Sequence, residues 1–407
     1  MIADLHIHYP MHLISDPDED PTLERMVRPW RRRHPRDWLR ALVLEIASRG
    51  FNYRDWSSGR RVDLKKMHYG RVGLGFSVLL DPSTEFDTSH WYGPPQPRYV
   101  KAIEDQLDMV EEVVAGQDAA GWGAVAHNRD ELRATLDAGK VALVHCVEGG
   151  FQLGGTDEEI ERTVAHLAGR GVVYVTLAHL FWRRVATNAN AFPFLTDKRY
   201  GHWFPEPSVG LTHRGRAAAR AMARNRVLID VSHMSQTALD DTFAVLEECD
   251  RELGRTAPVL ATHVATRHGE GGLAYNVTRE TVERIAARDG VVGLIMGDHI
   301  MSDGLRPEPA RGERRTTDFD DSFELLCSHI DRINEWTGRP FRHVGIGSDL
   351  DGFIKPTLAG VETAEDMCKL EVALADRYGP ASADQICSAN ALRMLFDYRW
   401  PVAPASA

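Results

Sequence analysis

The sequence contains few cysteines and no long apolar segment. Its 407 residues include five cysteines that are odd in number, far apart and never arranged as Cys-x-x-Cys: Cys146, Cys249, Cys327, Cys368 and Cys387. This pattern indicates neither a disulfide framework nor a cysteine-based metal knuckle, and it favours a reducing, cytoplasmic setting. Apolar runs such as residues 72–80 reach at most about half the length of a membrane span. The first ten residues carry Asp4, His6 and His8 in place of a basic region followed by an apolar one, so we expect neither a signal peptide nor a transmembrane helix.

Positive charge is scarce except in one segment. The net charge is −11, but residues 21–71 contain 14 Lys or Arg against 5 Asp or Glu. Such a segment could bind an acidic partner, yet Trp38, Leu42 and Ile46 recur at the spacing of an amphipathic helix whose charges face solvent. An acidic chain of this kind argues against general nucleic-acid binding. We therefore expect a small-molecule substrate and neither a nucleic-acid nor a membrane partner.

Short apolar or β-branched runs alternate with helical patterns along the whole chain. The runs that predict strands are 2–8, 72–80, 141–147, 172–178, 226–232, 258–263, 290–296 and 342–349. Helical patterns span 99–114, 157–169, 214–225, 235–253, 278–288 and 318–336. Eight strands in this alternation predict a single α/β domain, residues 1–407, folded as a (β/α)8 TIM barrel. A doubly wound sheet shows the same alternation, but it usually carries a glycine-rich turn after its first strand, and HIHYPMH is no such turn.

Two connections are too long to be simple links between a strand and a helix. They span residues 9–71, after the first strand, and 182–213, after the fourth. In a barrel such segments lie at the carboxyl ends of the strands, where active sites are built. We expect both insertions to form the wall or lid of a pocket.

Polar residues gather at the carboxyl ends of six of the eight predicted strands. These residues are His6, His8, Glu148, His179, His233, His263 and Asp349. A single histidine at a strand end is usually a hydrogen-bonded core or loop residue. Many ionisable groups at one rim are costly to bury unless they are paired or bind metal. Together they predict a metal centre.

The ligand types suggest the chemistry of this centre. Neutral imidazole and carboxylate suit zinc and similar first-row ions, and a carboxylate between two histidine pairs can bridge two ions. Two ions can hold a hydroxide between them and polarise a substrate carbonyl. A free carboxylate such as Asp349 can move the proton to the leaving group. This set predicts hydrolysis of an amide or an ester.

Several motifs in the same order resemble one known family. VHCVEGG, YVTLAHL, GLTHRGRAAARAMARNRVLIDVSHMS, PVLATH, HVGIGSDLDG and SANALRML are similar to segments of the membrane dipeptidase (renal dipeptidase) family, within the metal-dependent amidohydrolase superfamily. The resemblance covers residues 141–397 and the first ten residues, whereas 9–140 matches poorly. It implies a (β/α)8 barrel, a homodimer, and hydrolysis of a dipeptide or related amide, often with a D-residue at the carboxyl-terminal position.

The resemblance also implies a role for each strand-end residue. His6 and His8 would bind one Zn²⁺, His233 and His263 would bind a second, and Glu148 would bridge both. His179 would contact the substrate carbonyl and stabilise the tetrahedral intermediate. Asp349 would be the general base and acid, and we prefer it to Asp351 because the family motif places the functional carboxylate first. Outside this set, we expect His145 to face away from the barrel interior and Asp230 to support structure.

Two positions depart from the family pattern and bear on the substrate. The family opens on His-x-Asp, whereas His8 stands at the second position here, which removes one negative charge from the centre. The family also places an Arg before the Asn that follows the sixth strand, where this chain has Tyr275 before Asn276. Arg267 could hold a substrate carboxylate instead. The departures leave open a non-peptide amide, an N-acyl amino acid or a lactone as substrate, and a non-catalytic barrel that binds an acidic partner through 21–71 is a third hypothesis.

Overall fold

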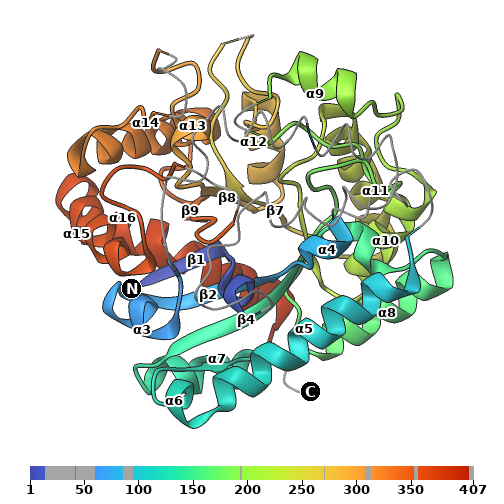
Figure 1. The fold of residues 1–407 in the computed structure, drawn as a ribbon, viewed down its shortest axis with the longest axis horizontal. Helices are drawn as coiled ribbons and strands as arrows, with labels where there is room; N and C mark the ends of the chain where they lie inside the picture. Colours follow the sequence, from blue (N-terminus) through green and yellow to red (C-terminus); the bar gives the residue numbers. More distant parts are fainter. Residues whose placement is uncertain are drawn as a thin grey trace.

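The computed structural model describes most of the chain outside the first insertion. The described residues are 1–13, 42, 60–85, 95–192, 195–269, 271–307, 313–352 and 356–402. Most of the predicted 9–71 insertion, and with it most of the basic segment 21–71, lies outside them. Figure 1 shows the strands at the centre of the molecule with helices around them.

Parallel strands close into a barrel in the described part of the chain. They are β1 (Ile2–Ile7), β2 (Val72–Leu79), β4 (Val141–Glu148), β5 (Tyr174–Thr176), β6 (Leu228–Asp230), β7 (Val259–Val264), β8 (Val291–Leu294) and β9 (Val344–Ile346). Each pairs with the next in this order, and β1 pairs with β9, so the ring is complete. The predicted eight-stranded TIM barrel is thereby confirmed, and the doubly wound alternative is wrong.

One further strand, β3 (Gly123–Val125), was not predicted. It pairs with the first residues of β4, Val141–Leu143, whereas β5 pairs with the last two residues of β4. The two short strands thus lie on the same side of β4, one beyond the other. Three residues, Gly-Ala-Val, are too few to show the alternation from which a strand is predicted.

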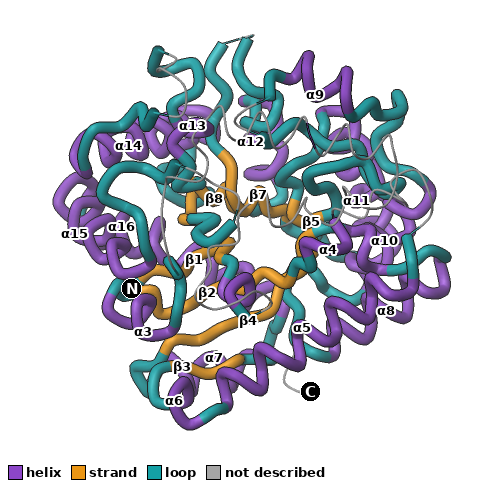
Figure 2. The backbone as a smooth tube through the Cα atoms, in the orientation of Figure 1, coloured by secondary structure: helices purple, strands orange, loops and turns teal. Residues whose placement is uncertain are grey.

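Helices form the outer layer (Figure 2). The predicted ones are α5 (Pro97–Ala115), α8 (Asp157–Gly169), α10 (His213–Arg224), α11 (Gln236–Leu253), α12 (Arg279–Ala287) and α14 (Phe319–Thr337). The others are α3 (Leu64–Tyr69), α4 (Pro82–Glu85), α6 (Gln117–Ala120), α7 (Arg129–Asp137), α9 (Asp197–Trp203), α13 (Asp298–Met301), α15 (Met367–Tyr378), α16 (Pro380–Asp384) and α17 (Asn390–Arg393). Hydroxyl side chains cap several of the predicted helices, for example Thr156 before α8 and Ser235 before α11. These caps explain why the predicted starts agree with the structure to within two residues.

The barrel strands are buried on both faces, as a sheet covered by helices requires. Ile2, Leu5 and Phe76 have no exposed surface, and they belong to one continuous apolar core that also includes Tyr174. None of the helices in the described residues combines the length and the apolar composition needed to cross a bilayer.

The second predicted insertion, 182–213, packs against the loop after β6. Asn188 forms an isolated antiparallel bridge with Met234, and the amide of Ala189 donates to the carbonyl oxygen of His233 at 2.7 Å. Another bridge joins Ala186 to Leu211 within the insertion. This segment is therefore fastened to the strand end that carries His233.

Candidate metal centre

The carboxyl ends of the barrel strands bring all the predicted strand-end residues together. His6 lies near the end of β1, Glu148 ends β4 and His263 lies near the end of β7. The other four residues, His8, His179, His233 and Asp349, follow the ends of β1, β5, β6 and β9. All seven residues are buried, with at most 8% of each residue's surface exposed.

Glu148 lies at the centre of this group. The Nε2 atoms of His6 and His233 are each 3.4 Å from its Oε1, and that of His263 is 3.6 Å away. The Nε2 atoms of His8 and His179 lie 3.5 and 3.4 Å from its Oε2. One carboxylate is thus surrounded by five imidazoles, each presenting the same ring atom.

Two three-residue groups share Glu148. His6, His8 and Glu148 form one, and Glu148, His233 and His263 form the other, with the ligand atoms of each within 4.8 Å of one another. The Nε2 atoms are 3.3 Å apart in the pair His6–His8 and 2.9 Å apart in the pair His233–His263. Each group offers two nitrogens and one carboxylate oxygen, which is the donor set of a catalytic zinc site.

The protonation states in this cluster fit metal binding. Burial alone would raise the pKa of Glu148, but the nearby charges of His179 and His6 hold it well below its usual range. Burial and the adjacent His6 and His233 hold the pKa of His263 well below its ordinary value, and burial lowers that of His233. Neither carboxylate oxygen of Glu148 has a hydrogen-bond partner among the described residues. An ionised carboxylate that is buried without a hydrogen-bond partner, beside the neutral imidazoles of His233 and His263, favours binding of a cation.

A hydrogen-bonded layer beneath the cluster fixes the ring nitrogens that face away from Glu148. Asp230 accepts hydrogen bonds from the hydroxyls of Thr176 and Thr262, at 2.7 and 2.8 Å. Because the Thr262 hydroxyl donates to Asp230, it accepts from the Nδ1–H of His263, which is 2.9 Å away. This arrangement leaves the Nε2 lone pair of His263 for a metal ion. Asp230 thus has a supporting place, as the sequence predicted.

Tyr174 does the same for His6. Its hydroxyl donates to the carbonyl oxygen of Leu5 at 3.0 Å and lies 2.9 Å from Nδ1 of His6. With its proton given to Leu5, the phenol accepts from Nδ1–H, so Nε2 of His6 also points its lone pair at the cluster. Tyr174 was not identified from the sequence, because a tyrosine within a buried strand usually indicates core packing.

The two neighbouring aspartates differ in what they face. Oδ1 of Asp349 lies 3.0 Å from Nε2 of His8, on the edge of the cluster. The carboxylate of Asp351 instead accepts from the backbone amides of Arg61 and Val62, at 2.9–3.2 Å. Gly352 provides room for Asp349, since a Cβ atom there would lie 2.0 Å from Oδ1. The geometry therefore favours Asp349 as the free carboxylate.

His179 is oriented by a residue that sequence reasoning missed. Its Nδ1 is 3.1 Å from Oε2 of Glu85, a fully buried residue that ends the short helix α4. Burial lowers the pKa of His179, but the charges of Glu148 and Glu85 outweigh this effect and raise it to about 9. His179 is then a charged hydrogen-bond donor at neutral pH. No strand-end residue of β2 was predicted from the sequence. A carboxylate shortly after this strand could have drawn attention to Glu85.

The three predicted substrate-binding residues lie after β7. Tyr275 is buried against His233, with ring centroids 5.0 Å apart, and its hydroxyl donates to the backbone carbonyl of His263 at 2.7 Å. The side-chain amide of Asn276 donates to the carbonyl oxygen of Ile300. Arg267 is half-buried, and its backbone amide donates to Val277. Tyr275 thus lies beside the metal ligands, with its hydroxyl already engaged by the protein.

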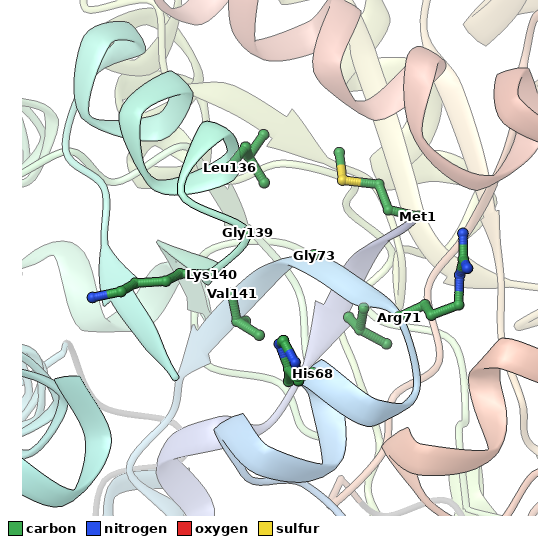
Figure 3. Close-up of a pocket in the computed structure, with 9 residues that line it drawn as sticks. Met1, His68, Arg71, Gly73, Leu136, Gly139, Lys140 and Val141 are labelled. Carbon is green, nitrogen blue, oxygen red and sulfur yellow. The ribbon is translucent and has the colours of Figure 1, made fainter. Parts of the chain in front are cut away.

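A separate pocket opens at the other end of the barrel. It has a volume of about 400 Å³ and lies beside Met1 and the first residues of β2 and β4, Val72 and Val141. Figure 3 shows His68, Leu136 and Lys140 around it. Because it meets the amino ends of the strands, it lies away from the metal ligands, and we assign it no part in their chemistry.

The comparisons with known proteins agree with this site. The family model described as membrane dipeptidase (peptidase family M19) matches residues 29–398. The chain belongs to this family. It is therefore an M19 dipeptidase-like metallo-hydrolase, and its buried His and Glu groups are consistent with a metal site. The match begins after His6 and His8, so for these two residues it is the structure that places them in the cluster.

Two relatives of the chain are dipeptidases by name. It is 26% identical over 337 residues to the dipeptidase tcpJ of Claviceps purpurea, covering 82% of this chain and 68% of that protein. It is 27% identical to the uncharacterized dipeptidase C965.12 of Schizosaccharomyces pombe, covering 75% of this chain and 64% of that protein. A metallo peptidase from Rhodobacter sphaeroides, liganded with a phosphinate mimic of L-Ala-D-Ala, shares the fold with a TM-score of 0.64 at 20% identity, over 98% of this chain and 99% of that one.

Proposed function

We propose that this M19 enzyme is a dinuclear zinc dipeptidase. The observation that carries the proposal is the sharing of Glu148 by two His pairs, His6 with His8 and His233 with His263. Two bound ions would supply an activated water and a polarised scissile carbonyl. Neutral imidazole and carboxylate ligands suit Zn²⁺, and other first-row divalent ions fit the same donors.

Asp349 has the position needed for proton transfer, and His179 has the charge and position needed to stabilise an oxyanion. Asp349 would accept the proton of the attacking water at Oδ1 and pass it to the nitrogen of the leaving amine. His179, charged and held by Glu85, would donate through Nε2 to the oxyanion that forms from the carbonyl. Burial of both groups keeps bulk water from competing for these hydrogen bonds.

We favour a dipeptide as the substrate. A ligand bound to a structurally similar enzyme supports this choice. The phosphinate bound to the Rhodobacter sphaeroides enzyme mimics L-Ala-D-Ala. Tyr275 cannot pair with a substrate carboxylate by charge, so Arg267 is our candidate for that role. If no cation serves this role, an amide or a lactone without a free carboxylate suits the site better. Together with N-acyl amino acids, these substrates make up the second candidate function.

The test is a substrate panel with the zinc-loaded protein. L,L- and L,D-dipeptides, N-acyl amino acids and lactones are assayed side by side, with Asp349→Asn as the inactive control. We expect dipeptide turnover that Asp349→Asn lowers by at least about 10³-fold while metal content is kept. Turnover of only the blocked amides or lactones would replace the dipeptidase proposal with the second candidate.

The remaining expectations concern the setting of the enzyme. We infer a cytoplasmic homodimer from the family resemblance and from the five cysteines, all of which lie in the described residues and are free. Family membership replaces the hypothesis of a non-catalytic barrel. Any role of the basic segment 21–71 in binding an acidic partner would be in addition to catalysis.

A further inference from the structure

A second group of potential metal ligands lies outside the barrel. Glu111 belongs to α5, His127 lies between β3 and α7, and His145 belongs to β4. Nε2 of His127 is 2.9 Å and Nε2 of His145 is 3.5 Å from the same oxygen, Oε1 of Glu111. The three ligand atoms lie within 4.8 Å of one another. Along β4, His145 precedes Glu148 by three residues, so its side chain points to the opposite face of the strand, as the sequence predicted.

His145 is fully buried, and its one close polar neighbour among the described residues is the carboxylate of Glu111, 3.5 Å from Nε2. Its side chain has no exposed surface, and neither ring nitrogen makes a hydrogen bond with any described residue. Burial lowers its pKa, so the ring is neutral. A neutral imidazole with both nitrogens unpaired in the core is costly. Its Nε2 faces the carboxylate of Glu111, which is the position of a metal ligand.

His127 is held in the orientation that a metal ligand needs. Its Nδ1 lies 2.8 Å from Oε2 of Glu131, and its backbone amide donates to the same oxygen at 2.9 Å. Burial lowers the pKa of His127, but its hydrogen bonds to Glu111 and Glu131 raise it above the ordinary value. A metal ion between Nε2 and Oε1 of Glu111 would take the place of the proton on Nε2, while Nδ1 keeps its proton toward Glu131. A carboxylate behind a histidine is the usual support of a metal-bound imidazole.

The charged groups around Glu111, His127 and His145 have a net negative charge, which favours binding of a divalent cation. Asp108 is a third carboxylate in this region, and the guanidinium of Arg170 contacts Glu111 at 3.0 Å and Asp108 at 2.8 Å. With Glu131, three carboxylates and one guanidinium leave two negative charges, which a Zn²⁺ ion in place of the proton on Nε2 of His127 would balance. The distances resemble those of the catalytic cluster, where nitrogen and oxygen atoms lie 3.0–3.6 Å apart.

We propose that Glu111, His127 and His145 bind a Zn²⁺ ion on the outer face of the barrel. Two imidazole nitrogens, one carboxylate oxygen and a water complete a tetrahedral set. The ion ties α5 and the β3–α7 connection to β4, the strand that carries Glu148. It therefore stabilises the outer wall of the catalytic strand and takes no part in catalysis.

Zinc counting tests this site independently of activity. Wild type and His127→Gln are loaded with Zn²⁺, freed of excess metal by gel filtration and analysed by mass spectrometry. His127 is a third exposed, so its replacement leaves the core intact. We expect His127→Gln to hold one zinc equivalent fewer than wild type, with dipeptide turnover within about two-fold. The matched control is His213→Gln, because His213 also pairs with a carboxylate, Asp157 at 2.7 Å, but lies on the surface without a second histidine.

The opposing result is equally clear. The contacts of His127 could instead reflect a protonated imidazole between Glu111 and Glu131, and in that case wild type, His127→Gln and Glu111→Gln bind the same amount of zinc. That outcome would overturn the proposal. An anomalous-scattering peak at the zinc edge between Glu111, His127 and His145 would support it. Loss of zinc in His233→Ala reports on the catalytic centre alone. The proposal for the outer site and the proposed function can therefore be rejected independently of each other.

Discussion

Single residues around Glu148 divide into those that face it and those that hold the facing groups in place. The five imidazoles were predictable, because histidines at strand ends form a visible pattern in the sequence. Glu85, Tyr174 and Thr262 were not, since each is an ordinary residue type whose role depends on a contact between distant segments. These supporting residues are recognised only from their contacts with the imidazoles in the three-dimensional structure.

Replacing Glu85 by Gln tests its hold on His179. The amide keeps the shape but loses the charge that helps to raise the pKa of His179 to about 9. We expect kcat to fall roughly 10- to 100-fold with metal content unchanged. The pH range over which kcat is maximal should also end at a lower pH, because the His179 imidazolium loses its proton at lower pH without the charge of Glu85. The control is Glu104→Gln, which changes an exposed glutamate that pairs with His166. Equal kinetics of the two variants would show that Glu85 does not support catalysis through His179.

Gly352→Ala tests the space around Asp349. The new Cβ would lie 2.0 Å from Oδ1 and 2.9 Å from Cδ2 of His8, so the carboxylate has to move. Displacing a proton-transfer group by about 1 Å costs roughly 10²-fold in kcat. Gly201→Ala, where a Cβ meets nothing within 4 Å, should leave kcat unchanged. Normal turnover by Gly352→Ala would show that Asp349 does not need its observed position.

Thr262→Val tests the layer beneath the metals. The change keeps the shape but removes the hydroxyl that joins Asp230 to Nδ1 of His263. We expect a 10- to 100-fold loss of metal affinity, measured by competition with a chelator. The matched control is Thr316→Val, which removes a buried hydroxyl bonded to Asp298. If both variants bind metal like wild type, the hydroxyl does not set the ligand's orientation.

Whole elements were more predictable than their connections. Strands and helices such as β4 and α8 were located within a residue or two, because buried parallel strands are apolar throughout and the helices begin at hydroxyl caps. The three-residue strand β3 and the four-residue helix α4 were missed. Such short elements carry no periodicity and exist through contacts with the barrel. Glu85 was missed with its helix.

The insertion 182–213 should respond to pH through Glu206. Burial raises the pKa of this carboxyl from 4.5 to about 8, and its Oε2 accepts from the amide of Asn188 at 3.0 Å. The folded protein therefore keeps a proton that the unfolded chain releases above pH 4.5, so stability falls as pH rises from 4.5 to 8. Glu206→Gln should match wild type near pH 4.5 and exceed it by roughly 2–4 kcal/mol above pH 8.

Urea unfolding of both proteins between pH 4.5 and 9 measures this difference, and contributions shared by the two proteins cancel. Parallel stability curves across this range would mean that Glu206 is ionised in the folded protein. The hydrogen bonds of Glu206 with Asn188 and Tyr200 would then outweigh the effect of burial on its pKa.

At the scale of the whole molecule, the two ends of the barrel differ in the residues that they carry. The carboxyl ends of the strands hold the metal ligands, whereas the amino ends meet the pocket beside Met1. The fold is shared with a relative at only 20% identity, which shows how little sequence the barrel itself demands. We propose that substrate choice is set on this carboxyl-terminal side, by His8 after β1 and by Tyr275 in the segment after β7.

Removal of the catalytic metals should affect the whole molecule. Without them, Glu148 remains ionised and buried among imidazoles. We expect the chelator-treated protein to lose activity and to melt at a lower temperature, with both restored by Zn²⁺. His233→Ala should melt near the metal-free wild type and respond less to added zinc. A melting temperature that is indifferent to zinc would contradict a metal centre in the core.

The most direct measurement is a zinc titration of the metal-free enzyme, followed by hydrolysis of an L,D-dipeptide. His127→Gln is used so that only the catalytic centre is filled. Turnover should be absent without metal and should reach its plateau at two bound equivalents, as two ions sharing Glu148 require. A plateau at one equivalent would contradict the dinuclear centre, and metal binding without turnover of any dipeptide would contradict the proposed function.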